Sequence, residues 1–219
     1  MIVRPSRAPS ISIYMSYIFL VGAPGSRWSS VAKNISSSAE IDTTDQSDTR
    51  QYTHGIAQHT GSYFDPGMEY GNWFDDISSR DVKQNEAEFN KPFKGILNKS
   101  KYRIIKSHAM ATGLDYLHEK WSYAKIILVY RSNKKCFDWW KEAGGFDISY
   151  PSYAWYKDDD NMKEQIALQN KHIKAFVKKN ELEWNVRDNF DLSERLGISI
   201  PFDNVHQIYA NNDIKVAVL

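Results

Sequence analysis

Three short segments carry residues suited to holding and transferring an anionic group. Residues 22–30 read GAPGSRWSS and combine glycines, serines and an arginine. Residues 103–108 read RIIKSH, which places a lysine two positions before a histidine. Residues 125–131 read KIILVYR, an apolar run closed by Arg131. If the fold brings these segments together, they predict a site for a phosphate-like anion.

The first segment resembles an ATP-binding loop but lacks its lysine. That loop would read G-x-x-x-x-G-K-[ST] after a buried strand. Gly22 and Ser29 stand in register with it, whereas Arg27 replaces the second glycine and Trp28 replaces the lysine. The lysine normally reaches the terminal phosphates, so its absence argues against hydrolysis of ATP or GTP.

A tight turn before a helix binds anions even without a lysine. The backbone N–H groups converge at the positive end of the helix dipole. The hydroxyls of Ser26, Ser29 and Ser30 add further donors. The alternative is an ordinary corner between a strand and a helix.

Lys106 and His108 occupy positions i and i+2 of an expected strand, which predicts that both side chains point to the same side. A lysine can neutralise charge on a leaving group, and a histidine can take a proton from an attacking hydroxyl near neutral pH. Arg131 can hold a phosphate through two parallel hydrogen bonds. The alternatives are a strand end in water for the first pair and a surface ion pair with Asp or Glu for Arg131.

The elements needed to position these residues follow from hydrophobic periodicity. Strands are expected at residues 17–23, 102–108 and 125–131, and helices at 28–39, 81–100, 112–122, 133–143 and 160–180, with another around LSERLGI before Gly197. This alternation predicts a single α/β domain over residues 1–219, with a central, mainly parallel sheet flanked by helices. Such sheets bind ligands beyond the carboxyl ends of their strands. Residues 1–16 are expected to be a loose lead-in.

Composition narrows the function classes. The 219 residues carry a net charge of +1, which argues against a broad nucleic-acid surface. The single cysteine, Cys136, excludes an intramolecular disulfide and suits a reducing, cytoplasmic location. No apolar run reaches the length of a membrane span. Arg4 and Arg7 before apolar residues 11–21 have the shape of a signal peptide, but Ser12 and Ser16 interrupt the run and favour a core strand.

In their order along the chain, the three segments resemble the sulfotransferases that use 3′-phosphoadenosine 5′-phosphosulfate. The family's phosphosulfate loop is similar to Y-P-K-S-G-T-T-W. Residues 23–30 share its proline and its serine, Pro24 and Ser26, and have Ser29 at a threonine position. RIIKSH matches the family's R-[IV]-I-K-[ST]-H at every position. Residues 129–135, VYRSNKK, resemble its [VY]-x-R-N-x-x-D through Arg131.

The resemblance implies a three-layer P-loop NTPase-like fold and sulfonate transfer from this co-substrate, without a metal, to a small-molecule or carbohydrate hydroxyl, or to an amine. It implies that the phosphosulfate lies on Pro24, Gly25, Ser26, Arg27, Trp28, Ser29 and Ser30, and that Arg131 holds the 3′-phosphate. His108 is the expected general base, with Glu69 in reserve and His54 and His59 behind it. Lys106 is expected to stabilise charge on the bridging oxygen.

The acceptor side is expected in the loops of residues 40–76. An aromatic wall there would comprise Tyr63, Phe64, Tyr70, Trp73 and Phe74. A second set, Trp139, Trp140, Tyr153 and Trp155, is interpreted either as another wall or as core packing.

Two positions depart from the family pattern. The family's loop lysine falls on Gly25, and Arg27 is the candidate to supply its charge. The serine expected eight residues after Arg131 falls on Trp139, with Ser132 or Lys134 as candidates to compensate. These departures keep open a non-catalytic binding protein of the same fold and, less favoured, a P-loop small-molecule kinase. The sequence identifies neither the acceptor nor the oligomeric state.

Overall fold

The structure is a computed structural model that describes residues 16–44, 52–54, 57–59, 77–90, 98, 101–148, 153–201 and 213–219. Its centre is a four-stranded sheet in the order β4-β1-β5-β6. The strands are β1 (Ser16–Gly22), β4 (Tyr102–Lys106), β5 (Lys125–Arg131) and β6 (Ile214–Val218). β1 pairs in parallel with both β4 and β5, and β6 pairs antiparallel with β5. The predicted α/β class with a mainly parallel sheet is confirmed.

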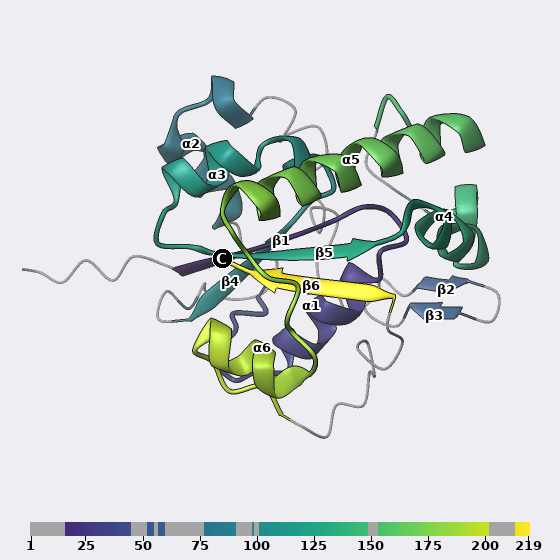
Figure 1. Cartoon of the computed structure of the whole chain (residues 1–219). Coiled ribbons are helices and arrows are strands. Elements are labelled where there is room, and N and C mark those ends of the chain that lie inside the picture. Colours follow the sequence, from purple (N-terminus) through teal and green to yellow (C-terminus); the bar gives the residue numbers. More distant parts are fainter. Residues whose placement is uncertain are drawn as a thin grey trace, which may run out of the picture.

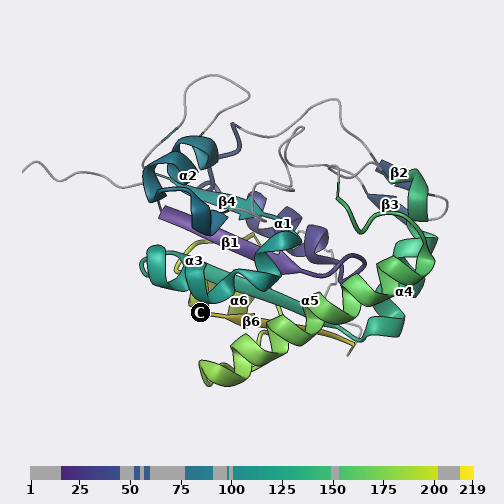
Figure 2. The same ribbon diagram turned by 90° about the horizontal axis from the view of Figure 1, so that it is seen from above.

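Helices cover both faces of this sheet (Figures 1 and 2). They are α1 (Trp28–Ser36), α2 (Val82–Phe89), α3 (Leu114–Lys120), α4 (Asn133–Glu142), α5 (Asp159–Lys179) and α6 (Asn189–Leu196), with short 3-10 turns at Ala109–Thr112 and Gly145–Asp147. Figure 1 shows α2, α3 and α5 on one face and α1 and α6 on the other. Within the described residues, no helix has both the length and the apolar character needed to cross a bilayer.

The central strand β1 is buried because it contributes to two cores. Tyr17, Phe19 and Val21 pack into the cluster under α3 and α5. Ile18 and Leu20 pack into the opposite cluster with residues of α1 and α6. Successive side chains of a strand point to opposite faces, so a sheet covered on both sides requires a continuous apolar run. The interpretation of this segment as a core strand is therefore confirmed.

Two helix boundaries and one strand differ from the sequence prediction. α1 ends at Ser36 and α2 ends at Phe89, so the helices expected over 28–39 and 81–100 are too long. α2 begins at a capping box in which the side chain of Asp81 accepts from the N–H of Gln84. β6 was not predicted, because five residues near the chain end become a strand only by pairing with the distant β5.

A two-stranded antiparallel hairpin lies within the segment expected to form loops. It consists of β2 (Tyr52–His54) and β3 (Ala57–His59). The sequence indicates loop or weak structure over residues 40–60, and this short hairpin is held by the hydrogen bonds of cross-strand pairing, which the polar sequence does not signal. Both views place this hairpin beside α4, at the end of the sheet where β1 and β5 finish (Figures 1 and 2).

Candidate functional site

The three chemistry-bearing segments meet at one rim of the sheet. Leu20 of β1 is level with Lys106 of β4, and Gly22 is level with Val129 of β5. Since these strands are parallel neighbours, the loop after β1, the end of β4 and the end of β5 all leave the sheet in the same direction. Arg131 is the last residue of β5, two positions beyond Val129.

Gly25 is held tightly against α4. The loop begins with a turn in which the N–H of Ser26 donates to the carbonyl of Ala23 over 3.0 Å. Gly25 has a φ of 75°, and a Cβ added to it would lie 1.9 Å from the carbonyl oxygen of Cys136. No side chain fits there without moving α4. A lysine, which the sulfotransferase pattern has at this position, would therefore not fit here.

The loop presents unused donors at the start of α1. Arg27 is the N-cap, has a φ of 67° and caps the helix with no side-chain hydrogen bond. In the described part of the chain, the first-turn N–H groups of Trp28 and Ser29 donate to no acceptor, whereas the N–H of Ser30 donates to the carbonyl of Arg27. The hydroxyl of Ser26 is buried without a partner. Free donors at a helix N-terminus suit an anion.

Trp28 is the contact point between this loop and β4. The imidazole of His108 stacks on its ring with centroids 4.1 Å apart. The ammonium of Lys106 lies 4.6 Å from the centre of the same ring. Lys106 Nζ also donates to Ser29 Oγ over 3.3 Å. The strand lysine therefore brings its positive charge to the residues that occupy the lysine and serine positions of an ATP-binding loop.

His108 is fixed by the loop it adjoins. β4 ends at Lys106, so His108 lies beyond the strand and the alternation of strand side chains does not decide where it points. The side chains of Lys106 and His108 nevertheless both contact the ring of Trp28. His108 Nδ1 lies 2.6 Å from the carbonyl oxygen of Gly22. A carbonyl only accepts, so Nδ1 carries the hydrogen and Nε2 is the nitrogen that can take up a proton. The side chain is 1% exposed, so it is shielded from bulk water.

Arg131 takes part in an ion pair that the sequence left open as an alternative. Its Nε and Nη2 donate to Asp213 Oδ2 over 3.1 and 3.0 Å. Its Nη1 lies 3.5 Å from the carbonyl oxygen of Gly25, which links it to the loop. Lys135 Nζ contacts the same Asp213 oxygen over 3.1 Å. Burial alone would raise the pKa of Asp213, but the hydrogen bonds from Lys135 and Arg131 outweigh it and hold this pKa below its usual value.

Arg27 extends toward α4 and lies over Trp139. The Arg27 guanidinium carbon lies 4.6 Å from the centre of the Trp139 ring, and that of Arg131 lies 5.9 Å from it. Burial, and then repulsion from Arg131, lower the pKa of Arg27 from its ordinary value. The two arginines are thus gathered around one indole, which is the residue at the family's serine position.

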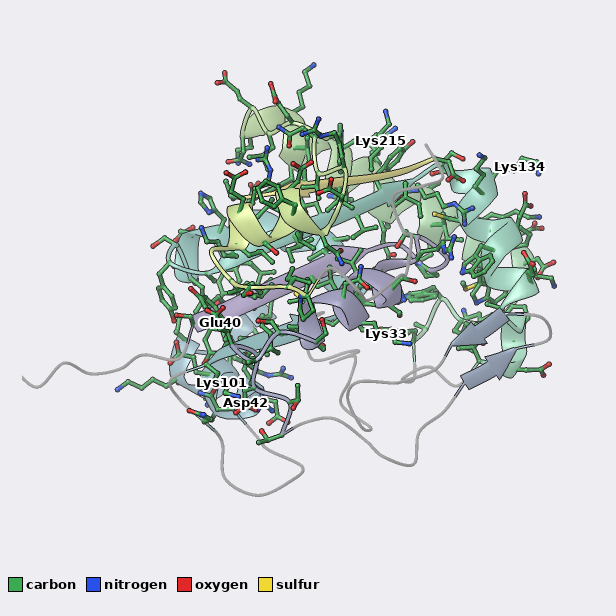
Figure 3. All side chains as sticks on the ribbon, turned by 90° about the horizontal axis from the view of Figure 1, so that it is seen from below. Lys33, Glu40, Asp42, Lys101, Lys134 and Lys215 are labelled. Atoms are coloured by element: carbon green, nitrogen blue, oxygen red, sulfur yellow. The ribbon has the colours of Figure 1, made fainter. Side chains whose placement is uncertain are left out.

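The remaining residues predicted to bind the donor, or to compensate for Trp139, are Pro24, Ser30, Ser132 and Lys134. Pro24 is buried in the turn and Ser30 is half-buried in the first turn of α1. Ser132 is the exposed N-cap of α4. Lys134 is 84% exposed and paired with Asp138, and Figure 3 shows it at the outer edge of the molecule.

The structure describes only some of the residues predicted for the acceptor side. Glu69 and the aromatic wall of Tyr63, Phe64, Tyr70, Trp73 and Phe74 lie outside the described residues. The backbones of His54 and His59 are described as strand residues, but their side chains are not. In the second aromatic set, Trp140 is buried and packs edge-on against Phe146 and Tyr156, and Tyr153 stacks on Trp155 with centroids 4.5 Å apart. Trp140 is therefore a core residue.

Sequence reasoning missed Asp213 and Lys135 as neighbours of Arg131. Lys135 lies four residues after Arg131, and the first turn of α4 brings it to Asp213. Asp213 lies 82 positions away along the chain and reaches Arg131 only because β6 pairs with β5. No local pattern signals that contact.

The single cysteine provides a test of this packing. Cys136 is fully buried, and burial is the main reason why its pKa is raised to about 12. The thiol should therefore stay protonated at pH 8 and react with a maleimide only after unfolding. Stoichiometric labelling is expected in guanidinium chloride and almost none in native buffer. Rapid labelling of the folded protein would show that the start of α4 separates from the loop.

Comparisons of this chain with protein-family models, with curated proteins and with solved structures found no match. Among the described residues, no group of three or more His, Cys, Asp or Glu side chains is placed to hold a metal ion.

Proposed function

We propose that this protein is a sulfotransferase that moves a sulfonate group from 3′-phosphoadenosine 5′-phosphosulfate to a hydroxyl, or an amine, of a small molecule or carbohydrate. The observation that carries the proposal is the contact of Lys106 Nζ with Ser29 Oγ over 3.3 Å. It joins RIIKSH, the segment with the most specific resemblance to the family, to the loop and first turn of α1, whose resemblance is weaker on its own. A P-loop-like arrangement of sheet and loop is part of the same proposal.

The residues of the rim would have separate roles in binding the donor and in transferring the sulfonate group. The N–H groups at the start of α1, with Ser26 and Ser29, would hold the phosphosulfate. The acceptor oxygen attacks sulfur, its proton passes to His108 Nε2, and the bond from sulfur to the bridging phosphate oxygen breaks. Lys106 would stabilise the negative charge that develops on that oxygen. Adenosine 3′,5′-bisphosphate then leaves, with its 3′-phosphate released from Arg131.

Binding of the product nucleotide is the first test. Calorimetric titration of the wild type with adenosine 3′,5′-bisphosphate is expected to show binding, and ATP with magnesium is expected to show little. Arg131→Ala should weaken the bisphosphate by about tenfold to a hundredfold, since a hydrogen bond to a charged group typically contributes about 1.5–3 kcal/mol. Arg187→Ala is the matched control. Arg187 also pairs with an aspartate, Asp191 of α6, but the Arg187 side chain is exposed.

The outcomes separate the competing functions. Preference for ATP with magnesium would favour a small-molecule kinase. Binding of the bisphosphate without sulfonate transfer to any acceptor in a screen of phenols, sugars and amines would favour a non-catalytic binding protein. The burial of His108 and the pairing of Arg131 with Asp213 are the observations that favour this second candidate. No binding of either nucleotide would contradict the sulfotransferase proposal.

A further inference from the structure

The indole of Trp28 is a common support for the two side chains proposed to act in the transfer step. Trp28 is the first residue of α1 and is buried. The imidazole of His108 lies nearly flat on its ring, with an angle of 26° between the two planes. The ammonium of Lys106 lies 4.6 Å from the centre of the same ring. One aromatic side chain therefore contacts both the expected base and the expected stabiliser of the leaving oxygen.

These contacts are made where water is excluded. The side chains of Lys106 and His108 are both buried. The face of an aromatic ring carries partial negative charge, and it attracts a cation more strongly when water does not compete. Among the aromatic residues tryptophan is the best partner for a cation. The ring of Trp28 therefore favours the Lys106 ammonium, and it would also favour the imidazolium that forms when His108 accepts a proton.

The loop and the end of β1 fix the indole and its two neighbours together. A Cβ added to Gly22 would lie 3.1 Å from Trp28 Cβ, so the start of α1 packs closely on this glycine. The carbonyl of Gly22 accepts from His108 Nδ1, and Ser29 Oγ, one residue beyond Trp28, accepts from Lys106 Nζ. The imidazole and the ammonium are thus each held by the ring and by an oxygen beside it.

An aromatic residue suits this position better than the lysine of an ATP-binding loop. Such a loop has its lysine where this chain has Trp28. Here the strand lysine, Lys106, brings its ammonium to the same place from β4. A lysine at position 28 would bring a second positive charge close to that ammonium and repel it. The indole instead offers an uncharged surface that attracts it.

We propose that Trp28 is a positioning residue of the transfer reaction, whose aromatic face holds the Lys106 ammonium and fixes the orientation of the His108 imidazole. The inference rests on the proposed function, because that function gives Lys106 and His108 their roles. Trp28 acts through these two side chains. Its backbone N–H belongs to the proposed anion site, so the ring can be replaced without removing that donor.

The test separates the aromatic face of Trp28 from its volume. Trp28→Phe and Trp28→Leu both make the side chain smaller, but only phenylalanine keeps a ring. With the acceptor found in the screen, Trp28→Leu should lower kcat by about thirtyfold, the worth of a desolvated contact between a cation and a ring, and Trp28→Phe by only about threefold. The dissociation constant of adenosine 3′,5′-bisphosphate should change by less than about threefold in both variants, because the N–H groups at the start of α1 remain.

A second readout needs no acceptor. Nitrogen-15 NMR of the nucleotide-free protein shows which imidazole nitrogen carries the hydrogen, and His108→Asn identifies the signals of His108. The wild type and Trp28→Phe should show one form, with the hydrogen on Nδ1 facing the Gly22 carbonyl. Trp28→Leu should show both forms, because the imidazole has lost the ring that orients it.

Trp184→Phe and Trp184→Leu are the matched controls, because this tryptophan packs on Tyr130 of β5, and neither variant should change the rate or the NMR signals. Thermal melts identify a variant that fails to fold, and Trp28→Met replaces Trp28→Leu in that case. If Trp28→Phe is as slow as Trp28→Leu, or if Trp28→Leu keeps either the wild-type rate or the single imidazole form, this inference is overturned. The proposed function then still stands on nucleotide binding and turnover of the wild type. A wild type that neither binds the bisphosphate nor transfers sulfonate would overturn both.

Discussion

Replacing Gly25 by alanine is expected to lower the free energy of unfolding by about 2–5 kcal/mol. The left-handed conformation at a φ of 75° costs an L-residue about 1–2 kcal/mol. The new Cβ would also lie 1.9 Å from the carbonyl oxygen of Cys136, and relieving such a contact by shifting backbone typically costs about 1–3 kcal/mol more. Denaturant unfolding followed by circular dichroism measures the sum.

Gly197 separates the two contributions. It follows α6 with a φ of 68°, and a Cβ added there would meet nothing within 4 Å. Gly197→Ala should therefore show the backbone penalty alone. If Gly25→Ala costs no more than Gly197→Ala, the loop is not packed against α4 in the way described. The same variant should weaken nucleotide binding, since any shift that relieves the contact moves the N–H groups at the start of α1.

Removing the imidazole of His108 is expected to reduce the rate of sulfonate transfer by about 10²–10⁴-fold, the usual contribution of a general base. The measurement is turnover of His108→Ala at saturating donor, once an acceptor has been found. His172→Ala is the control, because His172 is an exposed histidine on α5. Near-normal turnover of His108→Ala would remove His108 from the chemistry.

A second substitution distinguishes catalysis from positioning at His108. The imidazole also donates to the carbonyl of Gly22 through Nδ1, so alanine removes a structural bond as well as the candidate base. Asparagine can place an amide N–H near the Nδ1 position but has no basic atom in place of Nε2. His108→Asn should therefore be more stable than His108→Ala and equally slow. Recovery of the rate by asparagine would mean that His108 only holds the loop.

The candidate site was partly predictable because its components lie in local patterns. Continuous apolar runs identify β1 and β5, and strands alternating with helices imply a parallel sheet whose carboxyl ends share a rim. That reasoning predicts that the loop, Lys106 and Arg131 share one rim, and the strand register confirms it. The resemblance to sulfotransferases assigned roles to these residues, and those roles remain predictions.

What the sequence by itself determined is therefore the class of fold and the rim where the chemistry-bearing residues gather, since both depend on periodicity and on residues near one another in the chain. Tertiary structure alone decided how those residues are used. It placed α4 against Gly25, so that no lysine fits the loop there, and it brought Asp213 across 82 positions to Arg131. Such contacts are made between elements remote in sequence, and their energies depend on packing distances and burial that no local pattern encodes.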